Sequence, residues 1–157
     1  MGMWTRKKKI TISVLLAIVV ILIGGYLFGT HRVATTVPGH VYQYTSVNGN
    51  HKLYMAFSKN TDQVVVTANR AQAIKANSSD HNFQDVYDQE SKNGTWQYLA
   101  KGSHLTLSKT QSGKNSRWQY NRVLVLGKKM YAGSFTYQIA NAGQGVDRKN
   151  TTFERVR

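Results

Sequence analysis

The amino-acid sequence predicts a mainly β protein in which a single N-terminal transmembrane helix precedes an eight-strand antiparallel meander with one or two short helices in its middle. Three observations lead to this fold class. An unbroken apolar run follows a basic cluster near the N-terminus. Most of the later chain alternates apolar and polar residues between Gly and Asn turns, whereas one central segment has helical spacing. Such strands are expected to close into a barrel or a strongly curved sheet, because closure removes exposed strand edges.

The apolar run extends from Ile10 to Phe28 and contains 19 residues without a charge. As a helix with a rise of about 1.5 Å per residue it would span roughly 28 Å, close to the ~30 Å hydrocarbon core of a bilayer. Four cations at positions 6–9 precede the run and fewer follow it, which predicts a cytoplasmic N-terminus and an extracellular C-terminal domain. A cleavable signal peptide is the alternative, although the run exceeds the usual length of about 7–15 apolar residues and no A-x-A site follows it.

These features divide the chain into four parts. We expect a basic cytoplasmic flank at 1–9, the transmembrane helix at 10–28, a linker at 29–39 that contains the only proline, and an extracytoplasmic β domain at 40–157. The last part is long enough to bury one compact core. The chain has no cysteine, so disulfides and thiolate metal sites are excluded.

The first three strands are expected at 41–46, 51–57 and 63–68. The dipeptide Asn48-Gly49 lies between the first two and indicates a hairpin, because Asn and Gly both tolerate positive φ. Odd-numbered apolar residues of the second strand share one face, which we expect to point into the core. The three consecutive strands predict a meander.

A short amphipathic helix is expected within 80–92. Phe83, Val86 and Tyr87 follow an i, i+3, i+4 spacing that places them on one helix face. Asp80 is the expected N-cap, and Gly94 lies just beyond the end of the helix.

Five further strands are expected at 95–100, 103–109, 117–126, 129–139 and 151–157. Glycine-containing turns or loops separate them. In 129–139 the odd positions carry most of the aromatic and aliphatic residues, so the odd face is expected to be the core face along the whole strand.

Several of these residues carry a resemblance to a known family. The stretch GTWQYLAKGSHLTL and the closing TFERV resemble the small lipocalin-like (calycin-type) domains of bacterial exported proteins. The cysteine-free, Lys/Asn/Thr/Tyr-rich composition behind a basic-flanked anchor resembles surface proteins of Gram-positive bacteria of the lactobacillus type. The resemblance covers roughly residues 41–157 and implies a β-barrel outside the cell membrane.

The charge is strongly basic and uneven. The chain has 21 Lys and Arg against 7 Asp and Glu, and residues 101–157 hold 11 of those cations with only two acids. A positive field of this kind attracts polyanions. Outside a Gram-positive membrane these would be teichoic-type wall polymers or anionic lipid headgroups. The expected contacts are cations at presumed loop tips: Lys109, Lys114, Arg117, Lys128, Lys129, Arg148 and Lys149.

A lipocalin-like carrier of a small hydrophobic ligand is the alternative function. Its expected ligand contacts are the aromatic residues of two similar W-x-Y strands: Trp96, Tyr98, Trp118 and Tyr120. We expect Trp96 and Trp118 to line the core or a pocket in either case. Nucleic acid is an unfavoured partner, because an external domain does not meet it except in DNA uptake.

No catalytic, cofactor or metal-binding motif is recognised. The five histidines lack H-x-H or H-E-x-x-H spacing, and there is no G-x-S-x-G elbow or complete P-loop. The sequence therefore predicts a non-catalytic binding domain without a cofactor. An enzyme would have to use His104 or the carboxylates Asp85, Asp88 and Glu90.

Overall fold

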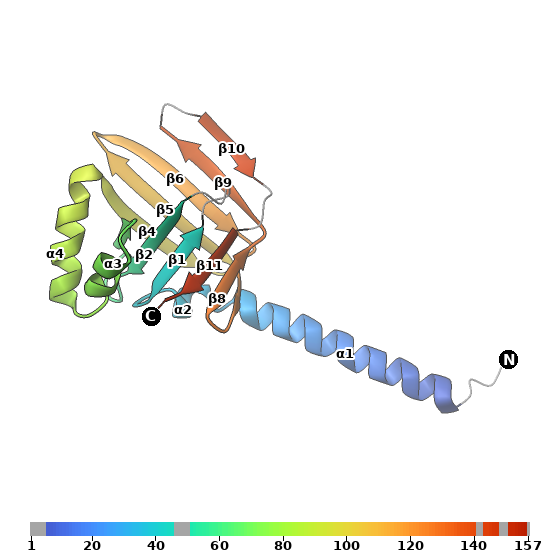
Figure 1. The fold of residues 1–157 in the computed structure, drawn as a ribbon. Coiled ribbons are helices and arrows are strands. Elements are labelled where there is room, and N and C mark those ends of the chain that lie inside the picture. Colours follow the sequence, from blue (N-terminus) through green and yellow to red (C-terminus); the bar gives the residue numbers. More distant parts are fainter. Residues whose placement is uncertain (1–5, 46–50, 141–142, 148–150, 157) are drawn as a thin grey trace.

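A computed structural model describes the backbone of residues 6–45, 51–140, 143–147 and 151–156, and Figure 1 shows its arrangement. The protein is mainly β, as predicted. The described strands form two antiparallel sheets of six and five strands. Two helices cover one sheet, and one long helix projects from the domain (Figure 1).

The projecting helix α1, Arg6–Thr30, corresponds to the predicted transmembrane segment. Its stretch Thr11–Gly29 is long and apolar enough to cross a membrane. The side chains from Thr11 to Phe28 are exposed, so the domain does not enclose them. In a soluble protein a helix that is apolar all round would be buried, and the exposure of this one is typical of a membrane-spanning segment.

The segment expected to be a linker contains the short helix α2, Val33–Thr36. Val33 and Val37 are both fully buried in the core. The hydroxyl of Tyr42 donates a hydrogen bond of 3.1 Å to the carbonyl of Thr36. Residues 33–37 are therefore part of the folded domain, and only His31 and Arg32 separate α2 from the end of α1 at Thr30.

The six-stranded sheet, called sheet A, has the order β3-β2-β1-β11-β8-β7. Its first three strands form the predicted meander, although the Asn48-Gly49 turn lies outside the described residues. Met55 and Phe57 face the core, as the alternation predicts. The strand bounds are β1 Val41–Thr45, β2 Lys52–Phe57, β3 Val64–Thr67, β7 Leu124–Leu126, β8 Lys129–Ala132 and β11 Thr151–Arg155.

The five-stranded sheet, called sheet B, has the order β10-β9-β6-β5-β4. It faces sheet A across the main core (Figure 1). Its strands are β4 Thr95–Lys101, β5 His104–Gln111, β6 Lys114–Asn121, β9 Ser134–Ile139 and β10 Gly143–Asp147. Strand β10 lies between the predicted strands 129–139 and 151–157, where only a glycine-containing loop was expected.

Two strands predicted as continuous, 117–126 and 129–139, are each broken at a corner and pass from one sheet to the other. Arg122 has a φ of +52°, which ends β6 before β7 begins. Gly133 separates β8 from β9 directly opposite, and its N–H donates a 3.1 Å hydrogen bond to the carbonyl of Asn121. A Cβ at Gly133 would approach Nε of Arg122 to 3.2 Å, so the bare glycine leaves room for the guanidinium.

The eight-strand meander and the closed barrel are therefore not what the described residues form. The two broken strands and the additional β10 give eleven strands in two sheets. Next to β3 and β4, which are edge strands of the two sheets, an isolated bridge joins Gln63 to Gln97. The N–H of Tyr98 also donates to the carbonyl of Asp62. These contacts join the sheets locally without a continuous ladder.

The main core lies between the sheets and is built around aromatic rings. Phe153 is fully buried and packs edge-to-face on Tyr120, with ring centroids 4.9 Å apart. Phe57 lies between Tyr42 and Tyr98 in the same type of contact. Buried aromatic pairs of this kind stabilise a core beyond the area that they bury.

A second core lies on the outer face of sheet A beneath α3, Arg70–Ala76, and α4, Asp80–Glu90. The predicted helix face is confirmed, since Phe83, Val86 and Tyr87 are the buried residues of α4. Sheet A is thus covered by sheet B on one face and, over β1–β3, by helices on the other.

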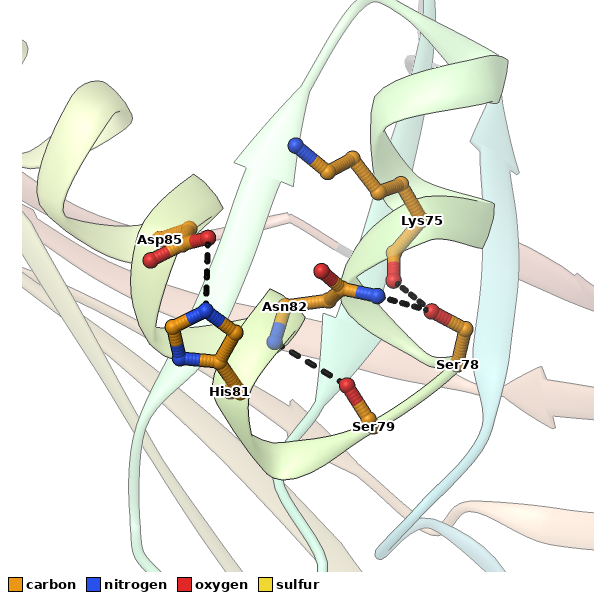
Figure 2. Close-up of polar contacts among 6 residues, drawn as sticks. All are labelled: Lys75, Ser78, Ser79, His81, Asn82 and Asp85. Carbon is orange, nitrogen blue, oxygen red and sulfur yellow. Dashed lines mark hydrogen bonds and ion pairs between the residues drawn. The ribbon is translucent and has the colours of Figure 1, made fainter.

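The junction between α3 and α4 is held by hydrogen bonds among short polar side chains (Figure 2). The N-cap of α4 is Ser79 rather than the expected Asp80, because the Ser79 hydroxyl accepts the N–H of Asn82 at 3.1 Å. The Asn82 amide donates to the Ser78 hydroxyl, which donates in turn to the carbonyl of Lys75. Ser and Asp are both good N-caps, so sequence alone did not separate these adjacent positions.

We expect the free energy of unfolding to fall as the pH rises from about 10 to about 12. Burial raises the pKa of Tyr42 from 10.0 to about 12, with nearby Arg155 opposing the shift. Below pH 10 the Tyr42 hydroxyl is protonated in both the folded and the unfolded chain. Between pH 10 and pH 12 it ionises in the unfolded chain but stays protonated in the folded one, so the free energy of unfolding falls. Chemical denaturation across this pH range measures the effect.

The substitution Tyr42→Phe tests the assignment to this residue. It should lower the free energy of unfolding by about 1 kcal/mol at neutral pH, because the hydrogen bond to Thr36 is lost. It should also make the fall in the free energy of unfolding between pH 10 and pH 12 smaller, because a titrating hydroxyl is removed. An unchanged decline would contradict the role of Tyr42.

Candidate binding site

The structure separates the predicted basic residues into three places. Lys109 and Lys114 line one pocket at the end of the β5–β6 hairpin. Arg117 lies on the opposite face of sheet B, and Lys128 and Lys129 lie at the β7–β8 turn near α1. The other two predicted contacts, Arg148 and Lys149, lie outside the described residues.

The β5–β6 connection is a tight turn rather than the expected long loop. Ser112 and Gly113 have φ values of +51° and +73°, as the two central residues of a type I′ hairpin turn require. The two strands therefore run to the turn itself, with Gln111 paired to Lys114. As a result Lys109 and Arg117 lie within strands and not at loop tips, which corrects their predicted placement.

The inner face of sheet B changes character along its strands. Cross-strand pairing places Leu107 beside Trp118, Lys109 between Trp96 and Ser116, and Gln111 beside Lys114. Directly paired residues share a face, so the same face is aliphatic near the core, then aromatic, and finally basic at the turn. The strands β4–β6 have seven or eight residues, whereas β1–β3 in the facing sheet have four to six. The longer strands leave the aromatic and basic end of this face partly uncovered.

The two tryptophans stack on each other at this end. The rings of Trp96 and Trp118 are 5.2 Å apart between centroids, with 28° between their planes. Nζ of Lys109 lies 5.7 Å from the centre of the Trp96 ring, within the range of a cation–π contact. Both tryptophans are half-buried and pack against the main core, in agreement with the expectation that they line the core or a pocket.

Gly94 leaves room for the stem of Lys109. A Cβ at Gly94 would lie 2.7 Å from Cε of Lys109 and 3.0 Å from the carbonyl oxygen of Thr110. Gly94 also has a φ of +110°, a backbone conformation that residues with a side chain rarely adopt. The glycine thus allows the lysine stem to lie flat across the start of β4, with its ammonium near the Trp96 ring.

The pocket at this end has a volume of about 440 Å³. Trp118, Ile139 and Ala140 give its lining an apolar part, whereas Lys109 and Lys114 supply positive charge. Ser116 adds a hydroxyl that already accepts the N–H of Ala140 at 3.0 Å. No Asp or Glu is among the residues that line it. The arrangement fits a ligand with an apolar or sugar-like face and a negative group.

Tyr98 and Tyr120, predicted with the tryptophans as ligand contacts, have structural roles instead. Tyr120 is 4% exposed, and burial raises its pKa well above 10.0, with the hydrogen bond to Tyr44 adding to the shift. The Tyr98 hydroxyl donates a 2.7 Å hydrogen bond to the carbonyl of Ser58. Among the four predicted aromatic contacts, the tryptophans are the ones at the pocket end.

Arg117 lies in a separate groove of about 470 Å³ on the outer face of sheet B. Amide and hydroxyl side chains surround it, including Gln119, Thr136, Gln138 and Gln144. The sheet lies between this groove and Lys109, so Arg117 does not act on the same bound group as the two lysines. The polar row was not recognised in the sequence, where alternation marked it only as a solvent face.

The acidic and histidine residues considered for catalysis are spread over the surface. Asp85 contacts His81 on the exposed side of α4 at 3.6 Å (Figure 2), and His104 contacts Asn121 on sheet B at 3.1 Å. Within the part of the chain that the structure describes, no group of three or more His, Asp or Glu residues is placed to hold a metal ion.

No protein-family model, curated protein or solved structure matches this chain. The resemblance to lipocalin-like domains therefore stays a prediction. The described fold of two sheets joined by a bent hairpin, with a basic and aromatic pocket, is the basis on which function is proposed.

Stability measurements should distinguish the pocket from the core. Phe153→Ala should cost about 3–5 kcal/mol, since a large, fully buried ring is removed from the core. Trp118→Ala should cost less, because part of its ring lies in the open pocket. Equal losses in urea unfolding would contradict this, and would make Trp118 an ordinary core residue.

Proposed function

We propose that the protein is a membrane-tethered, extracytoplasmic, non-catalytic domain that binds an anionic polymer of the cell envelope. The observation that carries the proposal is the pocket in which Lys109 and Lys114 lie beside stacked tryptophans. The strong positive charge of the C-terminal half supports it. The apolar helix α1 supports the tether.

The chemistry of the pocket suits a polymer of polyol or sugar phosphates, such as a teichoic-type polymer. An ammonium group attracts phosphate as a point charge, and an aromatic face packs against the apolar C–H face of a polyol or sugar. Separate lysines suit a flexible chain whose phosphates repeat, because each can contact a different phosphate. The absence of carboxylates from the pocket lining avoids repulsion of such a ligand.

The predicted orientation of the apolar helix supports a pocket on the outer side of the membrane, where such a polymer is found. Basic residues precede the apolar run, which favours retention of the N-terminus in the cytoplasm and export of the domain. A tether near the cell wall raises the effective concentration of the polymer, so individually weak contacts suffice. Lipid headgroups are the other anionic partner outside the membrane, and they fit a different pair of lysines, Lys128 and Lys129.

The alternative function is a lipocalin-like carrier of a small hydrophobic ligand. The apolar part of the pocket lining, formed by Trp118, Ile139 and Ala140, favours it. The two lysines and the core positions of Tyr98 and Tyr120 favour the polymer instead, since the pocket is open and charged rather than enclosed and apolar.

Neutralising the two pocket lysines tests the proposal. In the full chain, carried in nanodiscs of zwitterionic lipid, Lys109→Gln with Lys114→Gln should lower affinity for teichoic-type polymer about three- to tenfold, because exposed ion pairs contribute about 0.2–1 kcal/mol each. The matched control is Lys59→Gln with Lys75→Gln, which removes the same charge from exposed positions outside the pocket. Binding is measured by calorimetry at low and high salt.

The salt dependence separates the two functions. Polymer binding should weaken steeply as salt rises, because salt screens charges in an open pocket in which Lys114 is exposed and Lys109 is half-buried. Equal losses in the pocket and control variants would contradict the pocket and leave only a diffuse charge effect. Salt-insensitive binding of an apolar ligand that is lost in Trp118→Ala would support the carrier instead.

A further inference from the structure

The outer end of α1 is packed directly onto the domain. Gly29 is buried against β7, and a Cβ there would come within 2.5 Å of Cδ1 of Leu124 and 3.3 Å of the carbonyl oxygen of Val125. The guanidinium of Arg32 lies 5.2 Å from the centre of the Phe28 ring. With α2 buried immediately afterwards, the helix leaves the domain at a fixed place beside β8 (Figure 1).

The surface beside this exit exposes apolar and aromatic side chains that the domain does not cover. Leu126 is 54% exposed and Tyr131 is 40% exposed. Register places Leu124 opposite Tyr131 and Leu126 opposite Lys129, so these residues share the outer face of the β7–β8 hairpin. Leu124 is the residue that contacts Gly29, which makes the exposed face continuous with the end of the apolar helix.

Cations surround the same face. Lys128 and Lys129 are exposed at and just after the β7–β8 turn, and Arg32 is exposed at the helix exit. One exposed carboxylate, that of Glu154, lies on the neighbouring strand β11, where Glu154 is opposite Lys129 in the strand register. The described cations still outnumber it, so the charge of the face remains positive.

We propose that this face, formed by Arg32, Leu126, Lys128, Lys129 and Tyr131, seats the domain on anionic lipid headgroups. The inference rests on the proposed membrane anchor. When α1 spans the bilayer to Phe28, the adjoining hairpin lies at the level of the headgroups. Tyrosine is favoured at that depth, and long basic side chains reach the phosphates while their stems stay on apolar surface.

Seating would give the domain one orientation on the membrane. Strand β6 runs from Lys114 at the pocket end to Asn121, just before the corner that leads into β7. A strand of that length spans about 23 Å at a rise of about 3.3 Å per residue. The headgroup surface and the polymer pocket thus lie toward opposite ends of one rigid strand, and seating directs the pocket away from the bilayer.

Single thiols test the proposal in the full chain, which has no native cysteine. Leu126→Cys is labelled with an environment-sensitive fluorophore, and Leu99→Cys, similarly exposed on sheet B, is the matched control. Leu16→Cys, within α1, reports insertion. Each protein is reconstituted into vesicles of phosphatidylcholine alone or mixed with phosphatidylglycerol, with quenchers placed on lipid headgroups or acyl chains.

The label at position 126 should be quenched by headgroup quenchers several-fold more than the label at position 99, and more strongly in the anionic vesicles. Lys128→Gln with Lys129→Gln should remove the extra quenching, whereas Lys109→Gln with Lys114→Gln should keep it while weakening polymer binding. Equal quenching at positions 126 and 99, or no response to lipid charge and to Lys128 and Lys129, overturns the seating. A label at position 16 that acyl-chain quenchers do not reach overturns the anchor as well.

Discussion

A bend in one long hairpin fixes how the two sheets are placed against each other. Strands β6 and β9 pair in sheet B, and their continuations β7 and β8 pair in sheet A. The bend is possible because Arg122 adopts a positive φ and Gly133 has no side chain to collide with it. Since both sheets share this hairpin, the position of one relative to the other, and thus the aromatic core between them, follows from these two residues. The N–H of Val123 also donates to the carbonyl of Ser103, which ties the corner to the β4–β5 turn.

The same bend distributes the charged residues. Lys114 and Lys128 are only 14 positions apart in the sequence, yet the hairpin carries one to the open end of sheet B and the other to the exit of α1. The basic residues of the C-terminal half therefore do not form a single basic surface in the folded domain. The pocket end combines two lysines with stacked tryptophans, whereas the other end combines lysines with exposed Leu126 and Tyr131. The two ends therefore differ in the side chains that surround their lysines, and this difference is the reason for proposing a different anionic partner at each end.

Local patterns predicted what depends on local structure. The apolar run, the meander of β1–β3 and the buried face of α4 follow from residue periodicity and are present in the structure. The break at Gly133 between β8 and β9 was not predictable in this way. It changes which residues of 129–139 face the core, from even-numbered positions before the glycine to odd-numbered ones after it. Met130 and Ala132 face the core in β8, whereas beyond Gly133 the odd-numbered Phe135 packs against it. The pocket was also missed as a unit, because cross-strand register, rather than distance along the chain, brings Lys109 to Trp96 and Lys114 to the same end.

The burial of α2 bears on how the domain could be released from its helix. Val33 and Val37 close one end of the core, and each contributes about 1.5–3 kcal/mol if its burial is typical. A protease that cuts between Arg32 and Val33 would free a domain with its core complete. A cut only a few residues later, after Pro38, would remove both valines and the carbonyl that Tyr42 binds, and would leave the end of the core open to water. A cut that separates α1 from the domain and leaves this core complete would therefore fall at His31 or Arg32, the exposed residues between α1 and α2.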